Sequence, residues 1–172
     1  MKKRKESFWG LHFDFHARPD DKHIGRDLTE DDVREICRLL KPDFIQIDCK
    51  GHPGYASYPS EMGNAMPMAF DTLEMWRRIT AEYGIRLYMH ISGVFDKKYC
   101  EEHPEDVTFF AGEKPSTMVR LNGKYLDEYF IPQVSELVEK YGVDGIWVDG
   151  ECWAVHIDYH PEALKRFEET TG

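Results

Sequence analysis

The sequence predicts an α/β fold of the (β/α)8-barrel type. Strand-like apolar runs alternate with amphipathic helices along the 172 residues, and strict alternation implies a parallel sheet with right-handed crossovers. No glycine-rich phosphate loop follows the first strand, which disfavours an open nucleotide-binding sheet. A complete barrel usually needs about 250 residues. We therefore expect a partial barrel with about the first four β/α units, in which residues 1–172 form the N-terminal part of one domain and residues 1–6 a flexible tail.

The first β/α unit has the plainest signals. An aromatic-rich run at 8–15 is expected to form its strand. A helix is expected at 29–40, because Thr29 and Asp32 have the spacing of a helix cap and apolar residues recur behind them at helical intervals. The apolar run at 44–48 then begins the second unit as a strand.

The rest of the chain repeats this order after a long loop at 50–67, which is rich in Gly, Pro, Ser and Tyr. Gly84 ends one predicted helix, and Pro132 lies inside another, where it is tolerated or bends the helix. The region 95–122 is mixed and is expected to contain one short helix. The predicted helices are 70–83, 97–103, 125–141 and 161–170, and the predicted strands are 85–91 and 145–149.

Composition disfavours several classes of function. The net charge of -10 opposes binding to nucleic acid and to anionic membranes. No stretch approaches the roughly 20 apolar residues of a membrane span, and the basic start lacks the apolar core of a signal peptide. The four cysteines are widely spaced without a Cys-x-x-Cys pair, so free thiols are expected. We therefore expect a cytoplasmic protein with no nucleic-acid or membrane partner.

Polar residues gather at the carboxyl ends of all four predicted strands, which is where parallel barrels build their active sites. Residues at alternate positions of a strand share one face. This shared polarity predicts a functional site at one edge of the sheet. The side chains concerned are His12, Asp14 and His16 on the first strand, Asp48, Lys50 and His52 on the second, His90 and Ser92 on the third, and Asp149 and Glu151 on the fourth.

Glycoside hydrolysis is the first chemistry that these residues allow. It needs one carboxylate as nucleophile and one carboxylic acid as proton donor. Asp149 suits the nucleophile, because a strand end holds its carboxylate rigidly. Glu151 is a candidate for the acid, although its closeness in sequence does not ensure the roughly 5 Å separation across the bond; a carboxylate beyond residue 172 is the alternative. Aromatic side chains suited to stacking on a sugar are Tyr55, Tyr58 and Trp153.

Two other functions stay open at this point. His12, Asp14 and His16 could hold a metal ion together with Asp149, as in the metal-dependent amidohydrolases, which such a first strand resembles. The carboxylated lysine that those enzymes carry on their fourth strand is absent here. The third class is a carbohydrate-binding barrel without catalytic activity.

Short motifs along the chain match one known family in their order and spacing. The second-strand motif of that family is Lys-His-His-Asp-Gly-Phe, and this chain has Lys50-Gly51-His52-Pro53-Gly54-Tyr55. The third-strand motif of the family ends in Tyr-Ser, and this chain has the run from Tyr88 to Ser92. The helix before the fourth strand carries a Gln and a Glu-Leu pair in the family, matched here by Gln133 and Glu136-Leu137. The fourth strand reads Leu-Trp-Phe-Asp-Gly, against Ile146-Trp147-Val148-Asp149-Gly150. Nearly the whole chain thus resembles the N-terminal half of the α-L-fucosidases, and more closely a related group of fucosidase-like glycosyl hydrolases.

The resemblance implies a retaining glycoside hydrolase with fucosidase-like specificity and no metal or other cofactor. It carries the role of nucleophile to Asp149 and sugar-hydroxyl binding to His52. Gly51 and Pro53 depart from the family motif where it recognises the sugar, so the sugar and its linkage stay open. The strand-end residues and the resemblance together give Asp149 and Glu151 as the catalytic candidates. The substrate-binding candidates are Asp14, His16, Lys50, His52, Tyr55, His90, Trp147 and Trp153.

A half-barrel leaves two open sheet edges and one uncovered face. We therefore expect the chain alone to be inactive and marginally stable, and the complete protein to act on a carbohydrate. The oligomeric state is left open, a homo-oligomer of the full-length protein included.

Overall fold

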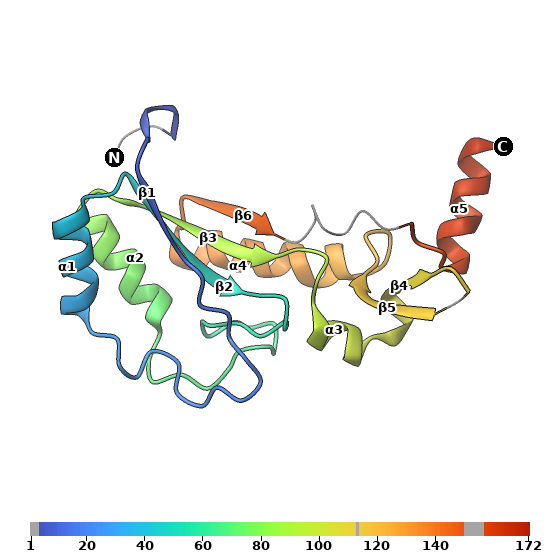
Figure 1. Cartoon of the computed structure of the whole chain (residues 1–172), viewed down its shortest axis with the longest axis horizontal. Coiled ribbons are helices and arrows are strands. Elements are labelled where there is room, and N and C mark those ends of the chain that lie inside the picture. Colours follow the sequence, from blue (N-terminus) through green and yellow to red (C-terminus); the bar gives the residue numbers. More distant parts are fainter. Residues whose placement is uncertain (1–3, 113, 150–156) are drawn as a thin grey trace.

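The computed structural model describes residues 4–112, 114–149 and 157–172. Within these ranges the centre of the fold is a parallel four-stranded sheet in the order β1-β2-β3-β6 (Figure 1). Leu11, Ile45 and Leu87 lie level with one another across its first three strands. The predicted alternation of strands and helices is confirmed. The strands are β1 Gly10–Phe13, β2 Phe44–Lys50, β3 Arg86–Ser92 and β6 Gly145–Asp149.

Three helices cover one face of this sheet (Figure 1). Alternate strand residues, Ile45 and Leu87 among them, are fully buried against helix residues such as Val33 and Leu137. Parallel strands with their crossover helices on one side form the wall of a (β/α)8 barrel, so the partial-barrel prediction is confirmed. The helices are α1 Glu30–Leu40, α2 Thr72–Glu82 and α4 Ile131–Tyr141.

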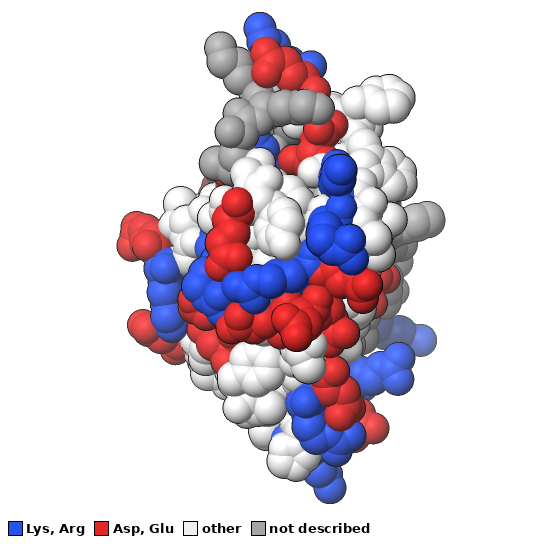
Figure 2. All heavy atoms as spheres, turned by 90° about the vertical axis from the view of Figure 1, so that its left-hand side faces the viewer, with Lys and Arg blue, Asp and Glu red and all other residues white. Residues whose placement is uncertain are grey.

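Capping begins α1 where the sequence predicts it. The Asp32 backbone N–H donates to the Thr29 hydroxyl, and the Thr29 backbone N–H donates to the Asp32 carboxylate. These two bonds satisfy N–H groups that lack partners at a helix start. The exposed side of α1 and α2 carries an ion-pair network in which Arg34 and Arg78 both contact Glu30, and Figure 2 shows acidic and basic side chains intermixed on this side.

The second face of the sheet is open, because no helix in the described part of the chain packs on it. Strand alternation places Gln46, Tyr88, His90 and Trp147 there, opposite to the helix-facing residues. Gly145 lies beside Tyr88, and a Cβ at that position would come 2.6 Å from the Tyr88 ring. We call this surface the open face; it corresponds to the interior of a closed barrel.

The region 95–122 contains more structure than the sequence predicts. The short helix is confirmed as α3 Lys97–Glu102, followed by a 3₁₀ turn at Pro104–Asp106. The antiparallel hairpin of β4 Val107–Phe110 and β5 Lys114–Val119 was not predicted. Its strands are short and β5 contains Pro115, which is typical of edge strands and weakens the sequence signal.

The predicted single helix at 125–141 is two elements. A wider π-helical segment at Tyr125–Phe130 precedes α4, and Pro132 lies in the first turn of α4. Proline has no N–H to donate and its ring crowds the carbonyl four residues earlier, so a wider turn before it relieves the conflict. The remaining elements are a 3₁₀ turn at Arg4–Glu6, the predicted first strand shortened to β1, and α5 Pro161–Thr171.

Lys50 is buried in a second, smaller core beside the sheet, which corrects its predicted place among the substrate-binding residues. Its ammonium lies 2.6 Å from Asp96 and donates to the Tyr125 hydroxyl at 2.5 Å. The Tyr125, Tyr129 and Phe130 rings surround it at 5.2–5.8 Å. The physical reason is a register shift between Asp48 and Lys50: a bulge at this place turns Lys50 away from the open face.

No helix within the described ranges is both long and apolar enough to cross a membrane. Cys37, Cys49 and Cys100 are buried and unpaired, in agreement with the predicted free thiols. Cys152 lies outside the described residues.

Lys50→Met is expected to lower the free energy of unfolding by about 3–5 kcal/mol, because it leaves the Asp96 carboxylate buried without its cation. Urea denaturation followed by circular dichroism measures the change. Lys97→Met is the control: Lys97 is exposed and lies 3.7 Å from Glu101, so its loss should cost less than about 1 kcal/mol. Equal losses in the two variants would contradict a structural role for the buried pair.

Candidate active site

The carboxyl ends of β2, β3 and β6 place a histidine between two aspartates on the open face. His90 Nδ1 lies 3.1 Å from Asp48 Oδ1, and His90 Nε2 lies 3.1 Å from Asp149 Oδ2. Strand register explains the meeting, because Asp48 lies level with His90 and Ser92 lies level with Asp149. The Asp48 side chain is fully buried, whereas 21% of the Asp149 side chain is exposed.

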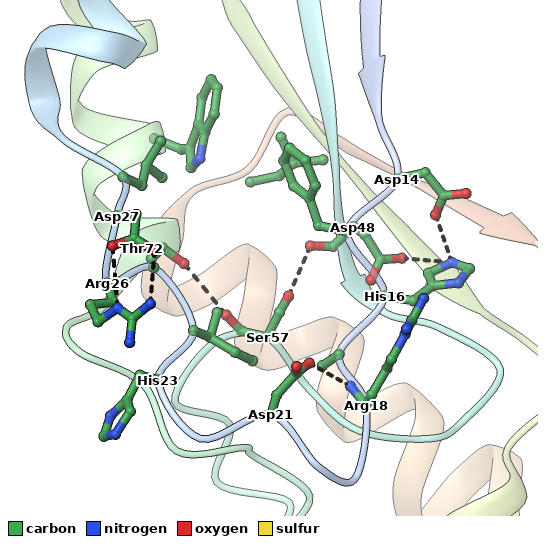
Figure 3. A pocket seen from close by; sticks show the side chains of 17 residues that line it. Asp14, His16, Arg18, Asp21, His23, Arg26, Asp27, Asp48, Ser57 and Thr72 are labelled. Carbon is green, nitrogen blue, oxygen red and sulfur yellow. Dashed lines mark hydrogen bonds and ion pairs between the residues drawn. The ribbon is translucent and has the colours of Figure 1, made fainter.

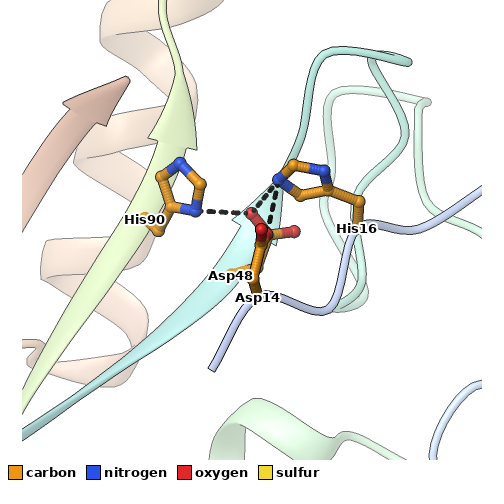
Figure 4. Close-up of side chains that lie close together, drawn as sticks. All are labelled: Asp14, His16, Asp48 and His90. Carbon is orange, nitrogen blue, oxygen red and sulfur yellow. Dashed lines mark ion pairs between the residues drawn. The ribbon is translucent and has the colours of Figure 1, made fainter. Parts of the chain in front are cut away.

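The segment after β1 adds a second aspartate and histidine. His16 Nε2 lies 2.8 Å from Asp14 Oδ1 and 3.4 Å from Asp48 Oδ1 (Figure 4). We call Asp14, His16, Asp48 and His90 the Asp–His cluster; one potential ligand atom of each lies within 4.8 Å of the others. Gly51 makes room for His16, since a Cβ at position 51 would come 2.5 Å from the His16 ring.

The pKa values of His90 and His52 shift in opposite directions. Burial by itself lowers the pKa of His90, but the Asp48 and Asp149 carboxylates beside its two ring nitrogens outweigh this effect, so the pKa of His90 is raised above its ordinary value. Burial lowers the pKa of His52. His90 is therefore the histidine that tends to hold its proton, and His52 the one that tends to be neutral.

His52 is held at the rim of the open face by two neighbours. Its Nδ1 lies 3.0 Å from the Ser92 hydroxyl, which donates to the Phe95 carbonyl at 2.7 Å. The ring also stacks on Phe95, with 4.9 Å between centroids. These contacts give one orientation to an imidazole that is only partly buried.

Trp147 provides an aromatic surface on the same face. Its indole stacks on His90 with 4.8 Å between ring centroids, and 46% of the residue is exposed. His12 touches the edge of this indole and pairs with Gln46, with 3.2 Å between His12 Nδ1 and Gln46 Oε1. The predicted metal set of His12, Asp14 and His16 is thus not the set that meets: Asp48 and His90 stand in place of His12.

A cavity of about 780 Å³ opens beside the Asp–His cluster. Asp14, His16 and Asp48 line one side of it, and the loop at 18–28 lines the other (Figure 3). A volume of this size suits a small ligand, and both sides of the cavity carry charged side chains, Arg26 and Asp27 on the loop side among them.

The family model for alpha-L-fucosidase matches residues 43–170. The chain belongs to the alpha-L-fucosidase family. No curated protein matches the chain at a significant level. The predicted resemblance is therefore confirmed by the family comparison.

Solved structures of fucosidases share this fold. The alpha-L-fucosidase isoenzyme 2 from Paenibacillus thiaminolyticus is 29% identical with a TM-score of 0.81, over 95% of this chain and 26% of that one. The alpha-L-fucosidase from Vibrio sp. strain EJY3 is 19% identical with a TM-score of 0.60, over 87% of this chain and 26% of that one. A hypothetical protein from Ruminiclostridium thermocellum ATCC 27405 is 17% identical with a TM-score of 0.64, over 81% and 75%. The chain thus spans about a quarter of the length of these two fucosidases.

The family-like residues on α4 hold the long loop after β2. Gln133 is fully buried, and its side-chain amide donates to the Ser60 hydroxyl and to the side-chain Oδ1 of Asn64, both at 3.2 Å. The Glu136 carboxylate accepts from the Tyr58 hydroxyl at 3.1 Å and from the Ser60 hydroxyl at 3.0 Å. Tyr58 is therefore a buried packing residue, which corrects the prediction that it stacks on a sugar.

The structure brings together most of the predicted site residues of this fucosidase-family chain. Tyr55 is partly buried in the loop after β2. The sequence places Asp48 at a strand end of the predicted site but does not single it out as a catalytic or substrate-binding candidate; its alternate spacing with Gln46 on β2 is the signal that it faces the site. Asp14, His16, His90, Trp147 and Asp149 meet on or beside the open face, His52 lies at its rim, and Glu151 and Trp153 lie outside the described residues.

Proposed function

We propose that this chain supplies the nucleophile and part of the sugar-binding surface of a retaining, α-L-fucosidase-like glycoside hydrolase. The observation that carries the proposal is the place of Asp149, at the carboxyl end of β6 and 3.1 Å from the His90 imidazole. Family membership supports the reaction class. The retaining mechanism, the role of Asp149 as nucleophile and the fucosyl substrate are what we propose beyond that class.

Asp149 has the properties that a nucleophilic carboxylate needs. A strand end fixes its position, and its partial exposure leaves it accessible from the open face. A neighbouring imidazole that tends to hold its proton favours the ionised form of a carboxylate. In the retaining mechanism Asp149 attacks the anomeric carbon while the glycosidic bond breaks and the leaving oxygen takes a proton from a carboxylic acid; water then hydrolyses the covalent glycosyl ester.

Sugar binding is proposed for the polar and aromatic groups around Asp149. His52, Asp14 and His16 offer hydrogen bonds to hydroxyl groups, and the exposed part of the Trp147 indole offers an apolar surface to sugar C–H groups. Tyr55, in the loop after β2, is proposed as a further contact with the sugar. The reaction also needs a carboxylic acid about 5 Å from the nucleophile; Glu151 is the candidate from the sequence and lies outside the described residues.

Asp149→Gly is expected to lower kcat on an aryl α-L-fucoside by several orders of magnitude in the complete gene product, because the covalent step loses its nucleophile. Added azide should restore part of the turnover by entering the vacated space, and the product should be the glycosyl azide of inverted anomeric configuration. Release of the aryl group and the product's anomeric form are measured. Asp20→Gly, at an exposed turn, should stay active. Near-normal turnover of Asp149→Gly would sink the assignment.

Trp147→Ala is expected to raise KM by roughly fivefold, since loss of one aromatic contact costs about 1 kcal/mol. The matched control is Trp9→Ala: Trp9 is exposed to a similar degree, 49% against 46%, but precedes β1 at the other end of the sheet. Steady-state kinetics on the same substrate compare the two. An unchanged KM in Trp147→Ala would remove the indole from the binding surface.

A further inference from the structure

We propose that the Asp–His cluster binds one divalent transition-metal cation, with zinc as the favoured ion. The inference does not rest on the proposed glycosidase function, and it assigns Asp14 and His16, proposed above as sugar-hydroxyl contacts, as ligands of the cation. The four residues come from three neighbouring segments: Asp14 and His16 from the segment after β1, Asp48 from β2 and His90 from β3 (Figure 4).

The donor set has the composition and spacing of a metal site. Two imidazole nitrogens and two carboxylate oxygens are ligands that zinc accepts in a tetrahedral arrangement. Bonds of about 2.0–2.2 Å place neighbouring ligand atoms of such a site about 3.3–3.6 Å apart. The contacts of Asp48 Oδ1 with His16 Nε2 and His90 Nδ1 are 3.4 and 3.1 Å, and that of Asp14 with His16 is 2.8 Å. Small side-chain movements would admit a cation.

Asp48 points independently to a bound cation. Its side chain is fully buried, and no contact of its two carboxylate oxygens with the described residues has full hydrogen-bond geometry; the nearest are the ion-pair contacts with His90 at 3.1 Å and His16 at 3.4 Å. The ion-pair contacts of Asp48 among the described residues are with the imidazoles of His16 and His90. No lysine or arginine of the described ranges forms an ion pair with this carboxylate. Burying a carboxylate without hydrogen bonds is costly, and a divalent cation would compensate that cost.

The surroundings of the cluster orient its two histidines. His90 presents Nδ1 to the cluster and Nε2 to the Asp149 carboxylate at 3.1 Å, which is the carboxylate–histidine arrangement that fixes the ring of a metal ligand. Gly51 allows the His16 ring to reach the cluster, because any side chain at 51 would meet that ring. Asp14 and His16 are partly exposed and leave an entry path.

The test is a zinc titration of the complete gene product after chelator treatment and dialysis. Isothermal titration calorimetry and elemental analysis should give one zinc per chain with a micromolar or tighter dissociation constant. Cobalt(II) in the same site should give the intense visible absorption of a tetrahedral ion. Asp48→Asn and His16→Gln should each weaken zinc binding at least about tenfold.

The matched control is His103→Gln. His103 is an exposed histidine whose Nδ1 lies 3.4 Å from Glu105, so it offers an imidazole and a carboxylate outside the cluster, and its loss should leave binding unchanged. Far-UV circular dichroism checks the fold of each variant; His16, at a partly exposed loop position, remains informative if Asp48→Asn does not fold. Absence of stoichiometric zinc, or equal binding by wild type and His16→Gln, overturns the proposal.

Discussion

The His90 imidazole, held between the Asp48 and Asp149 carboxylates, is the interaction on which the candidate site depends. It joins three neighbouring strands through side chains on one face, with 3.1 Å on either side of the ring. One carboxylate is fully buried and the other is partly exposed, so the imidazole connects the interior of the sheet to the surface where a substrate would lie. Two negative charges around one ring raise the pKa of His90 despite its burial.

The scaffold around this contact keeps the strand ends in place. Helices α1, α2 and α4 bury one face of the sheet, and the open face is left for polar groups. Buried polar contacts then secure the connections: Lys50 with Asp96, and Gln133 and Glu136 with the loop after β2. Because these contacts lie on the helix side or beyond the sheet, they stabilise the site without entering it.

Much of the fold could be predicted from the sequence because its signals are local. Alternating apolar runs, the Thr29 cap and the glycine at helix ends each predict an element from a few neighbouring residues. Period-two alternation also predicts that Gln46 and Asp48 share a face. Alternation predicts neither the strand register, which sets Asp48 beside His90, nor the bulge that turns Lys50 into the second core. The β4–β5 hairpin and the π-helical turn before Pro132 depend on contacts between distant segments, and so does the burial of Tyr58 by α4.

The central claim is that Asp149 forms a covalent bond to the sugar. The most direct measurement is mass spectrometry of the complete gene product after reaction with a fluorinated fucosyl fluoride, whose intermediate hydrolyses slowly. The account predicts one sugar per active site, on the peptide that contains Asp149. A label on another carboxylate would contradict the account, as would turnover with inversion of the anomeric centre.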